Sequence, residues 1–231
     1  SGLAVFWSPV EGGLWSGHTV SEHLSLVGCS DPAERAAWLD RFGLSGLSDR
    51  RAGVLSAGEA SRLSVLRCLV SGAEVMVMDE PLEHVQESMA EQCWDALRQA
   101  TAGSGRHLLF ATHDYTRVLG EADAVICLDR GAVIGSGAVS QLYQTPNDER
   151  VAGLWGPVNW LTPEQALRWC RRLESRPMAL RPQHVSIEPS DNGVMQVVQT
   201  RREGVLTRTT LRYADTREVR RWVHVTGRSL Q

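Results

Sequence analysis

The stretch Val75-Met76-Val77-Met78-Asp79-Glu80-Pro81 joins a short apolar run to two carboxylates and a proline. Such a run predicts a β-strand that is buried on both faces, as in a parallel sheet. In α/β sheets, ligands bind at the carboxyl ends of the strands. Asp79 and Glu80 are therefore candidate functional residues, although a strand that ends in Asp-Glu is also common as a solvated turn.

Upstream of this stretch, the sequence predicts one strand followed by short helices. Leu3-Ala4-Val5-Phe6 is apolar enough for a strand, and a Gly-rich loop follows it. Thr19 with Glu22 three residues later is a capping pattern, and Asp31 before Pro32 is a second helix start. We expect these short helices to form a helical subdomain over about residues 19–72.

Further helices and strands alternate between Ser56 and Ile134. Apolar residues at helical spacing predict a helix from Ser56 to Val70 and another through Val85, Met89, Cys93 and Leu97. The run 108–111 predicts a second buried strand, which ends in Thr112-His113-Asp114. The run 124–128 predicts a third, with Asp129-Arg130-Gly131 as a tight turn into Val133-Ile134. The order strand, helix, strand, helix, strand predicts an α/β fold with a mainly parallel sheet.

The pattern changes between Gly153 and Pro157. Thr162 to Gln165 has the form of a capping box, and the stretches 194–200 and 205–213 alternate in polarity between turn residues. The tail therefore predicts a small all-β domain. We expect the domains to cover residues 1–153 and 154–231.

Composition excludes several classes of protein. The chain has 231 residues, 42% of them hydrophobic, and a formal net charge of −3, so we expect no nucleic-acid partner. No run approaches the roughly 18 apolar residues of a membrane span, which predicts a soluble, cytosolic chain. The five cysteines lack zinc-ligand or disulfide-framework spacing and are expected to be reduced and mostly buried. Because the first residue is not Met, we expect a fragment or an expression-derived start.

Four segments in order resemble the ABC ATPase family: Leu55-Ser56-Ala57-Gly58-Glu59, Arg62 to Leu69, Val75 to Pro81, and Phe110 to Asp114. They are similar in order and interval to the family's signature helix, Walker B strand and H-loop. The resemblance covers most of residues 3–153. It implies a partial P-loop NTPase domain.

The resemblance assigns catalytic roles to Glu80 and His113 and a metal-binding role to Asp79, and it implies ATP and Mg²⁺ as the bound groups. Asp79 would hold Mg²⁺ through water, Glu80 would polarise the attacking water, and His113 would contact the γ-phosphate. These roles suit phosphoryl transfer, which depends on positioning and charge stabilisation.

The signature-like segment Ser56, Ala57, Gly58 and Glu59 is implied to bind the ATP of a partner subunit. The amino end of a helix suits an anionic phosphate. Dimerisation of two ATPase subunits, as a homodimer or a heterodimer, would then be part of the active site.

Several positions depart from the family pattern. The sequence contains no G-x-x-x-x-G-K-[ST] phosphate-binding loop (Walker A), so we expect this chain alone to be inactive. Trp7 stands where the Q-loop glutamine is expected, Ala57 replaces a signature glycine and Glu59 replaces a glutamine. Gln86 stands where the D-loop aspartate is expected.

The tail resembles the TOBE-type β-domain of importer ATPases, mainly through Leu180-Arg181-Pro182-Gln183-His184-Val185. The resemblance implies an ATP-hydrolysing importer subunit, peripheral to the inner face of the cell membrane, with a permease docked on residues 19–72. Three alternatives stay open: a degenerate, non-hydrolysing regulatory or adaptor protein, an ABC ATPase with no role in transport, and an unrelated β-appendage in place of the TOBE-like domain.

Overall fold

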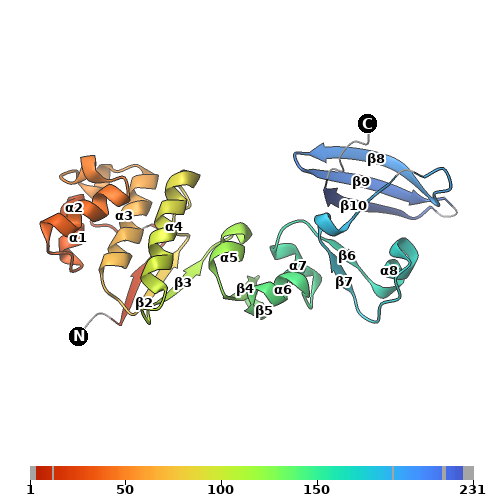
Figure 1. The fold of residues 1–231 in the computed structure, drawn as a ribbon, viewed down its shortest axis with the longest axis horizontal. Coiled ribbons are helices and arrows are strands. Elements are labelled where there is room, and N and C mark those ends of the chain that lie inside the picture. The colour runs from red at the N-terminus through yellow and green to blue at the C-terminus, as the bar shows by residue number, and fades with distance from the viewer. Residues whose placement is uncertain (1–3, 12, 189, 215–216, 226–231) are drawn as a thin grey trace. The chain divides into compact units, whose positions relative to one another are not determined.

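The computed structural model describes residues 4–11, 13–188, 190–214 and 217–225. The chain divides into two compact units, Ser1–Asp114 and Tyr115–Gln231 (Figure 1). Within the described residues, none of the helices combines the length and the apolar character that a membrane crossing requires.

Three parallel strands form the sheet of the first unit. They lie in the order β1-β2-β3, with bounds β1 Val5–Ser8, β2 Val75–Asp79 and β3 His107–Ala111. The predicted α/β class with a parallel sheet is confirmed for these strands. The first strand begins later than the sequence suggested, and Leu3 lies outside the described residues.

Within the described residues, four helices accompany this sheet, and the capping residues Thr19 and Asp31 predicted from the sequence start two of them. Their bounds are α1 Val20–Leu26, α2 Pro32–Arg41, α3 Ala57–Val70 and α4 Glu87–Thr101, with 3-10 turns at Ser45–Leu47 and Ala52–Val54. Thr19 with Glu22 and Ser56 with Glu59 form reciprocal capping boxes. The Asp31 side chain accepts a hydrogen bond from the backbone N–H of Ala33.

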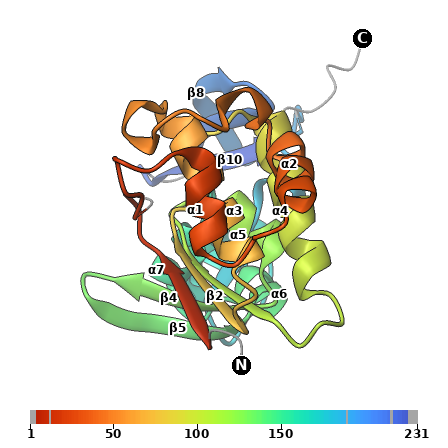
Figure 2. The same ribbon diagram turned by 90° about the vertical axis from the view of Figure 1, so that its left-hand side faces the viewer.

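The core of the first unit lies on one face of the sheet. Met76 and Met78 of β2 are buried in a cluster with residues of α3 and α4, and Trp94 meets Phe110 of β3 edge-on. Figure 2 shows the helices α3 and α4 of this unit next to β2. On the opposite face, Trp7 is 65% exposed and Leu109 is 59% exposed. The prediction that β3 is a buried strand is therefore wrong, and β2 is fully buried only on its Met76 face and half-buried at Val75 and Val77, because α3 and α4 pack against the Met76 face.

The second unit opens with a helix and an antiparallel hairpin. The elements are α5 Tyr115–Glu121, β4 Ala124–Asp129, β5 Ala132–Ala138, α6 Val139–Gln144 and α7 Glu149–Leu154. Among the described residues, β4 pairs antiparallel with β5 in a separate two-stranded sheet, so the prediction that it continues the parallel sheet is wrong. The reversal occurs at Arg130 and Gly131, whose φ angles of 48° and 77° form the tight turn.

Two small antiparallel sheets follow in the tail. One joins β6 Asn159–Leu161 and β7 Met178–Leu180, with α8 Pro163–Cys170 between them and a 3-10 turn at Pro182–His184. The other has the order β10-β9-β8, with bounds β8 Met195–Glu203, β9 Leu206–Tyr213 and β10 Val219–Val225. The predicted C-terminal β-sheet is confirmed, and β10 is a strand that the sequence analysis did not identify.

Arg181 connects this tail to the helices before it. Its side chain is 3% exposed and donates hydrogen bonds to the carbonyls of Ala152 (3.1 Å) and Tyr143 (3.3 Å). The guanidinium also lies 4.5 Å from the centre of the Tyr143 ring. The Arg-Pro segment that the sequence analysis singled out therefore has a structural role inside the second unit.

The cysteines are buried thiols, as expected. All five are free, and four of them are buried. Burial raises the pKa of Cys68 to about 12 and that of Cys93 to about 11. Since the thiolate is the reactive form, these two side chains act as small apolar core residues.

Candidate functional site

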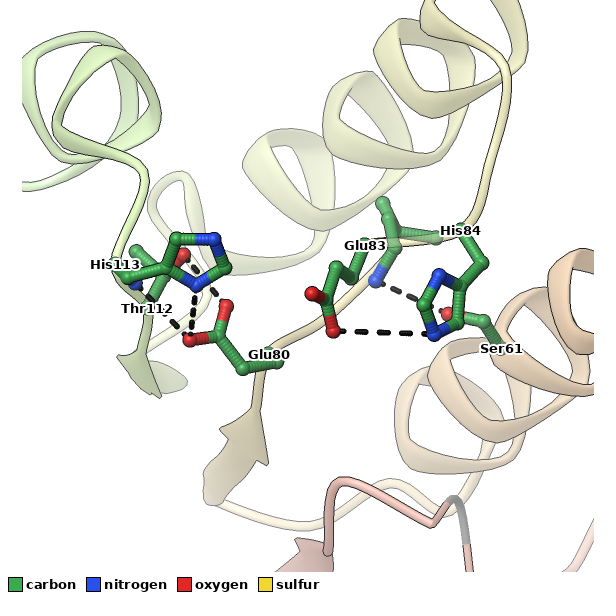
Figure 3. Close-up of polar contacts among 7 residues, drawn as sticks. Ser61, Glu80, Glu83, His84, Thr112 and His113 are labelled. Atoms are coloured by element: carbon green, nitrogen blue, oxygen red, sulfur yellow. Dashed lines mark hydrogen bonds and ion pairs between the residues drawn. The ribbon is translucent and has the colours of Figure 1, made fainter.

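The carboxyl ends of β2 and β3 bring Glu80 and His113 together (Figure 3). The Glu80 Oε2 atom accepts a hydrogen bond from the Thr112 hydroxyl at 2.8 Å. The Oε1 atom accepts from the His113 backbone N–H at 3.0 Å and lies 2.8 Å from His113 Nδ1. Both carboxylate oxygens are thus held by the two residues that follow β3.

The backbone at Glu80 explains how its side chain reaches β3. Its φ angle is 46°, and its N–H donates to the Ala111 carbonyl at 2.9 Å. A left-handed conformation at a non-glycine residue costs about 1–3 kcal/mol and persists where surrounding contacts hold it. Here those contacts are the backbone bond to Ala111 and the bonds from Thr112 and His113.

The Glu80 carboxylate raises the pKa of His113. The hydrogen bond to Glu80, followed by the negative charge of Glu80, raises the pKa of His113 above its ordinary value. The His113 side chain is 74% exposed, whereas that of Glu80 is 21% exposed. The pair therefore presents an accessible imidazole whose pKa is raised above its ordinary value.

Asp79 lies at the end of β2, one residue before Glu80. It is exposed and pairs in the strand register with Ala111 of β3. Carboxylate oxygen is a ligand type that Mg²⁺ takes, and Mg²⁺ keeps several of its waters in most protein sites. An exposed carboxylate at this edge of the sheet therefore fits the role implied by the resemblance.

The amino end of α3 is capped by its own residues. The Glu59 N–H donates to Ser56 Oγ at 3.3 Å, and the Ser56 N–H donates to Glu59 Oε2 at 2.8 Å. The bond from the Ser56 backbone lowers the pKa of Glu59. A carboxylate therefore already occupies the positive end of this helix.

Two contacts join α3 to the loop that follows Glu80. A Cβ atom at Gly58 would lie 2.7 Å from the His84 carbonyl oxygen, so the absence of a side chain allows this close approach. The Leu82 N–H donates to the Ser61 hydroxyl at 3.1 Å (Figure 3). Glycine at position 58 is thus explained by packing within this chain.

The structure places the sequence-predicted residues in two groups. Glu80 and His113 bond directly to each other, with Asp79 next to Glu80 in the chain. Ser56, Ala57, Gly58 and Glu59 form the start of α3, which contacts the loop after Glu80. No role was predicted for Ser61 or Thr112, although Thr112 directly precedes His113 in the sequence.

The sequence of this chain is similar to those of known ABC transporter ATP-binding proteins. The profile described as ABC transporter matches residues 5–83. The uncharacterized ABC transporter ATP-binding protein YdcT of Escherichia coli is 30% identical over 174 residues, covering 74% of this chain and 50% of the relative. The Fe(3+) ions import ATP-binding protein FbpC of Agrobacterium fabrum is 30% identical over 121 residues, covering 52% of this chain and 34% of the relative.

A third relative and one solved structure extend this comparison. The spermidine/putrescine import ATP-binding protein PotA of Ruegeria pomeroyi is 25% identical over 179 residues, covering 69% of this chain and 49% of its own. A structure titled as the ATP binding subunit of an ABC transporter has a TM-score of 0.54 at 20% identity and covers 67% of this chain and 64% of its own. This chain spans half or less of the length of these curated relatives.

Motif order, fold and sequence similarity all point to the same type of domain. The parallel sheet carries Asp79 and Glu80 at the end of β2 and His113 after β3, and the matched profile spans β1 to the loop after Glu80. The chain therefore carries part of an ABC transporter ATP-binding domain, matched directly over residues 5–83.

Proposed function

We propose that this chain is part of an ATP-hydrolysing subunit of an ABC importer, which couples ATP binding and hydrolysis to solute transport through a membrane permease. The observation that carries the proposal is the Glu80 carboxylate held by Thr112 and His113 at the edge of a parallel sheet. Relatives named as import ATP-binding proteins support the importer class.

In this proposal the chain's residues divide the work of phosphoryl transfer. Asp79 would hold Mg²⁺ through its waters, and Glu80 would orient and polarise the attacking water. His113 would donate a hydrogen bond to the γ-phosphate, for which its raised pKa is suitable. The ion, when bound, would neutralise negative charge on the phosphates.

The start of α3 would meet the nucleotide of a second subunit. Ser56, Ala57, Gly58 and Glu59 would then contact the partner's ATP, and dimerisation would complete the site. The Glu59 carboxylate would repel an anionic phosphate there, since both negative groups are attracted to the same positive end of the helix. We expect a weaker contact than an uncharged residue at position 59 would give.

A second candidate function is that of a degenerate, non-hydrolysing regulatory or adaptor protein. It is favoured by the Glu59 capping bond and by Trp7, which is 65% exposed where a glutamine is expected. In either case the printed chain holds no Walker A sequence, and we expect this chain alone to hydrolyse no ATP.

The remaining parts of the proposal concern location and partners. We propose a peripheral position at the inner face of the cell membrane, with the permease docked on residues 19–72. The sequence division at 153/154 would separate the ATPase part from a TOBE-like domain.

ATP turnover by the full-length gene product tests this proposal. Glu80→Gln should lower the rate by about 10²-fold or more, the usual contribution of a general base. Glu83→Gln, a charge-matched change in the same loop, should leave most of the activity. Equal rates for Glu80→Gln and the unchanged protein would remove Glu80 as the catalytic carboxylate. Absence of turnover in a protein that still binds a permease would support the adaptor.

A further inference from the structure

The imidazole of His23 is a buried hydrogen-bond bridge between α1 and the loop before it. His23 is 0% exposed, and its Nε2 atom accepts a hydrogen bond from the Trp15 backbone N–H at 3.0 Å. Its Nδ1 atom lies 2.8 Å from the Thr19 carbonyl. Because a backbone N–H can only donate, Nε2 carries no proton and Nδ1 donates to Thr19. The ring is therefore neutral and in one tautomer.

Aromatic rings and one arginine pack around this bridge. The Trp15 ring stacks on His23 with centroids 5.6 Å apart and planes at 22°, and His18 meets His23 edge-on at 5.9 Å. From α3, the Arg67 guanidinium lies 4.9 Å from the Trp15 ring centre and donates to the Gly13 carbonyl at 2.9 Å. Arg67 is itself 5% exposed.

These contacts hold the connection between β1 and α1, which we call the β1–α1 loop (residues 9–11 and 13–18). The backbone N–H groups of Ala52 and Gly53 donate to His18 and Ser16 of this loop. The loop leaves β1 at Ser8, which is paired with Met78 in the parallel sheet. It therefore starts from the sheet edge that also carries Glu80.

We propose that protonation of His23 releases the β1–α1 loop, so that this loop is closed at neutral pH and opens on acidification. A proton on Nε2 would remove the acceptor of the Trp15 N–H and place two donors against each other. It would also add a positive charge beside the buried Arg67. Opening of the loop would relieve both costs by exposing the ring to water.

The charged groups around His23 have opposite effects on its pKa. Arg67 on α3 and His18 in the loop disfavour a second positive charge, whereas Glu22 on α1 favours it. The Glu22 carboxylate accepts from the Thr19 N–H in the cap of α1, which fixes it there. Burial is the largest influence, and it lowers the pKa of His23.

The direction of the pH effect follows from proton linkage. In the open loop His23 would titrate as an ordinary histidine near pH 6.5, whereas in the closed loop its pKa lies lower. The open form thus binds the proton more tightly. Below about pH 6.5 the opening constant should rise up to about tenfold per pH unit, until the pH reaches the pKa of the closed form.

Hydrogen exchange of the Trp15 backbone amide, followed by NMR in the complete chain, tests this inference. After correction for intrinsic exchange, its protection should fall between about pH 7 and pH 5. The Glu80 amide, bonded to Ala111, should show no parallel loss. His23→Gln should abolish the pH-dependent part, and His18→Gln should keep it. The inference fails if His23→Gln keeps the pH dependence or if His18→Gln removes it.

A second measurement needs no substitution. The ring nitrogen shifts of His23 should report the tautomer with the proton on Nδ1 at neutral pH, and a titration midpoint below that of an ordinary histidine. Protonation at Nε2, or a midpoint at or above the ordinary value, would overturn the inference even if His23→Gln failed to fold.

Discussion

Glu80 and His113 are a coupled pair, and this coupling predicts how His113 titrates. The pKa of His113 is raised by the hydrogen bond to Glu80 and by its charge. Glu80→Gln should therefore shift the NMR titration midpoint of the His113 ring toward its ordinary value. Glu83→Gln is the matched control, since Glu83 contributes less to the same shift. A larger shift in the control would show that the Glu80 bond is not the main cause.

The pH range of this pair follows from the sign of the shift. A histidine whose folded-state pKa is raised stabilises the fold most fully below its ordinary pKa, near 6.5. That contribution is lost as the pH rises through the raised value. Because the His113 side chain is mostly exposed, salt should screen its charge interaction with Glu80 and so weaken it.

Single residues at the site were partly predictable from the sequence. Asp79, Glu80 and His113 follow apolar runs, and parallel strands place the residues after them at one edge. The left-handed backbone at Glu80 was not predictable, since it precedes Pro81 and has no glycine. It depends on the Ala111 carbonyl at the end of β3 and on donors from Thr112 and His113 after it, more than thirty residues away.

Among the helices, α3 approaches the loop after Glu80 so closely that position 58 has no room for a side chain. Gly58→Ala would place Cβ 2.7 Å from the His84 carbonyl oxygen and should destabilise the fold by about 1–3 kcal/mol. Gly46→Ala is the control, because no atom lies within 4 Å of its Cβ position. It should change stability by less than about 0.5 kcal/mol. Urea unfolding measures the free energy of unfolding of both variants. Equal losses would show that the structure accommodates a Cβ atom beside the His84 carbonyl without loss of stability.

Local signals predicted the elements better than their packing. Capping boxes set the starts of α1 and α3 because they involve residues three apart in the chain. Whether a strand is covered on one face or both depends on distant helices. An apolar run such as Val75 to Met78 therefore fitted either arrangement. The turn residues Asp129-Arg130-Gly131 marked the hairpin of β4 and β5 in the sequence, whereas the strand order suggested that β4 continues the parallel sheet.

At the scale of the whole chain, the position of Arg181 predicts which C-terminal fragment is stable. Residues 115–231 form a compact unit, whereas the sequence pattern changes near residue 153. Arg181 lies after that change, but its acceptors, the carbonyls of Tyr143 and Ala152, lie before it. A fragment of residues 154–231 would lose both acceptors, while a fragment of residues 115–231 would keep them.

Hydrogen bonds to a charged group contribute about 1.5–3 kcal/mol to stability, which is a large part of the stability of a small domain, and removal of α6 and α7 would also remove the packing around Arg181. The 115–231 fragment should therefore unfold cooperatively in urea, and the 154–231 fragment should be less stable by several kcal/mol. Arg181→Met in the longer fragment separates the loss of the Arg181 hydrogen bonds from the loss of α6 and α7, since it removes the charge and keeps the helices. If both fragments unfold at the same urea concentration, the Arg181 contacts do not join the tail to α6 and α7.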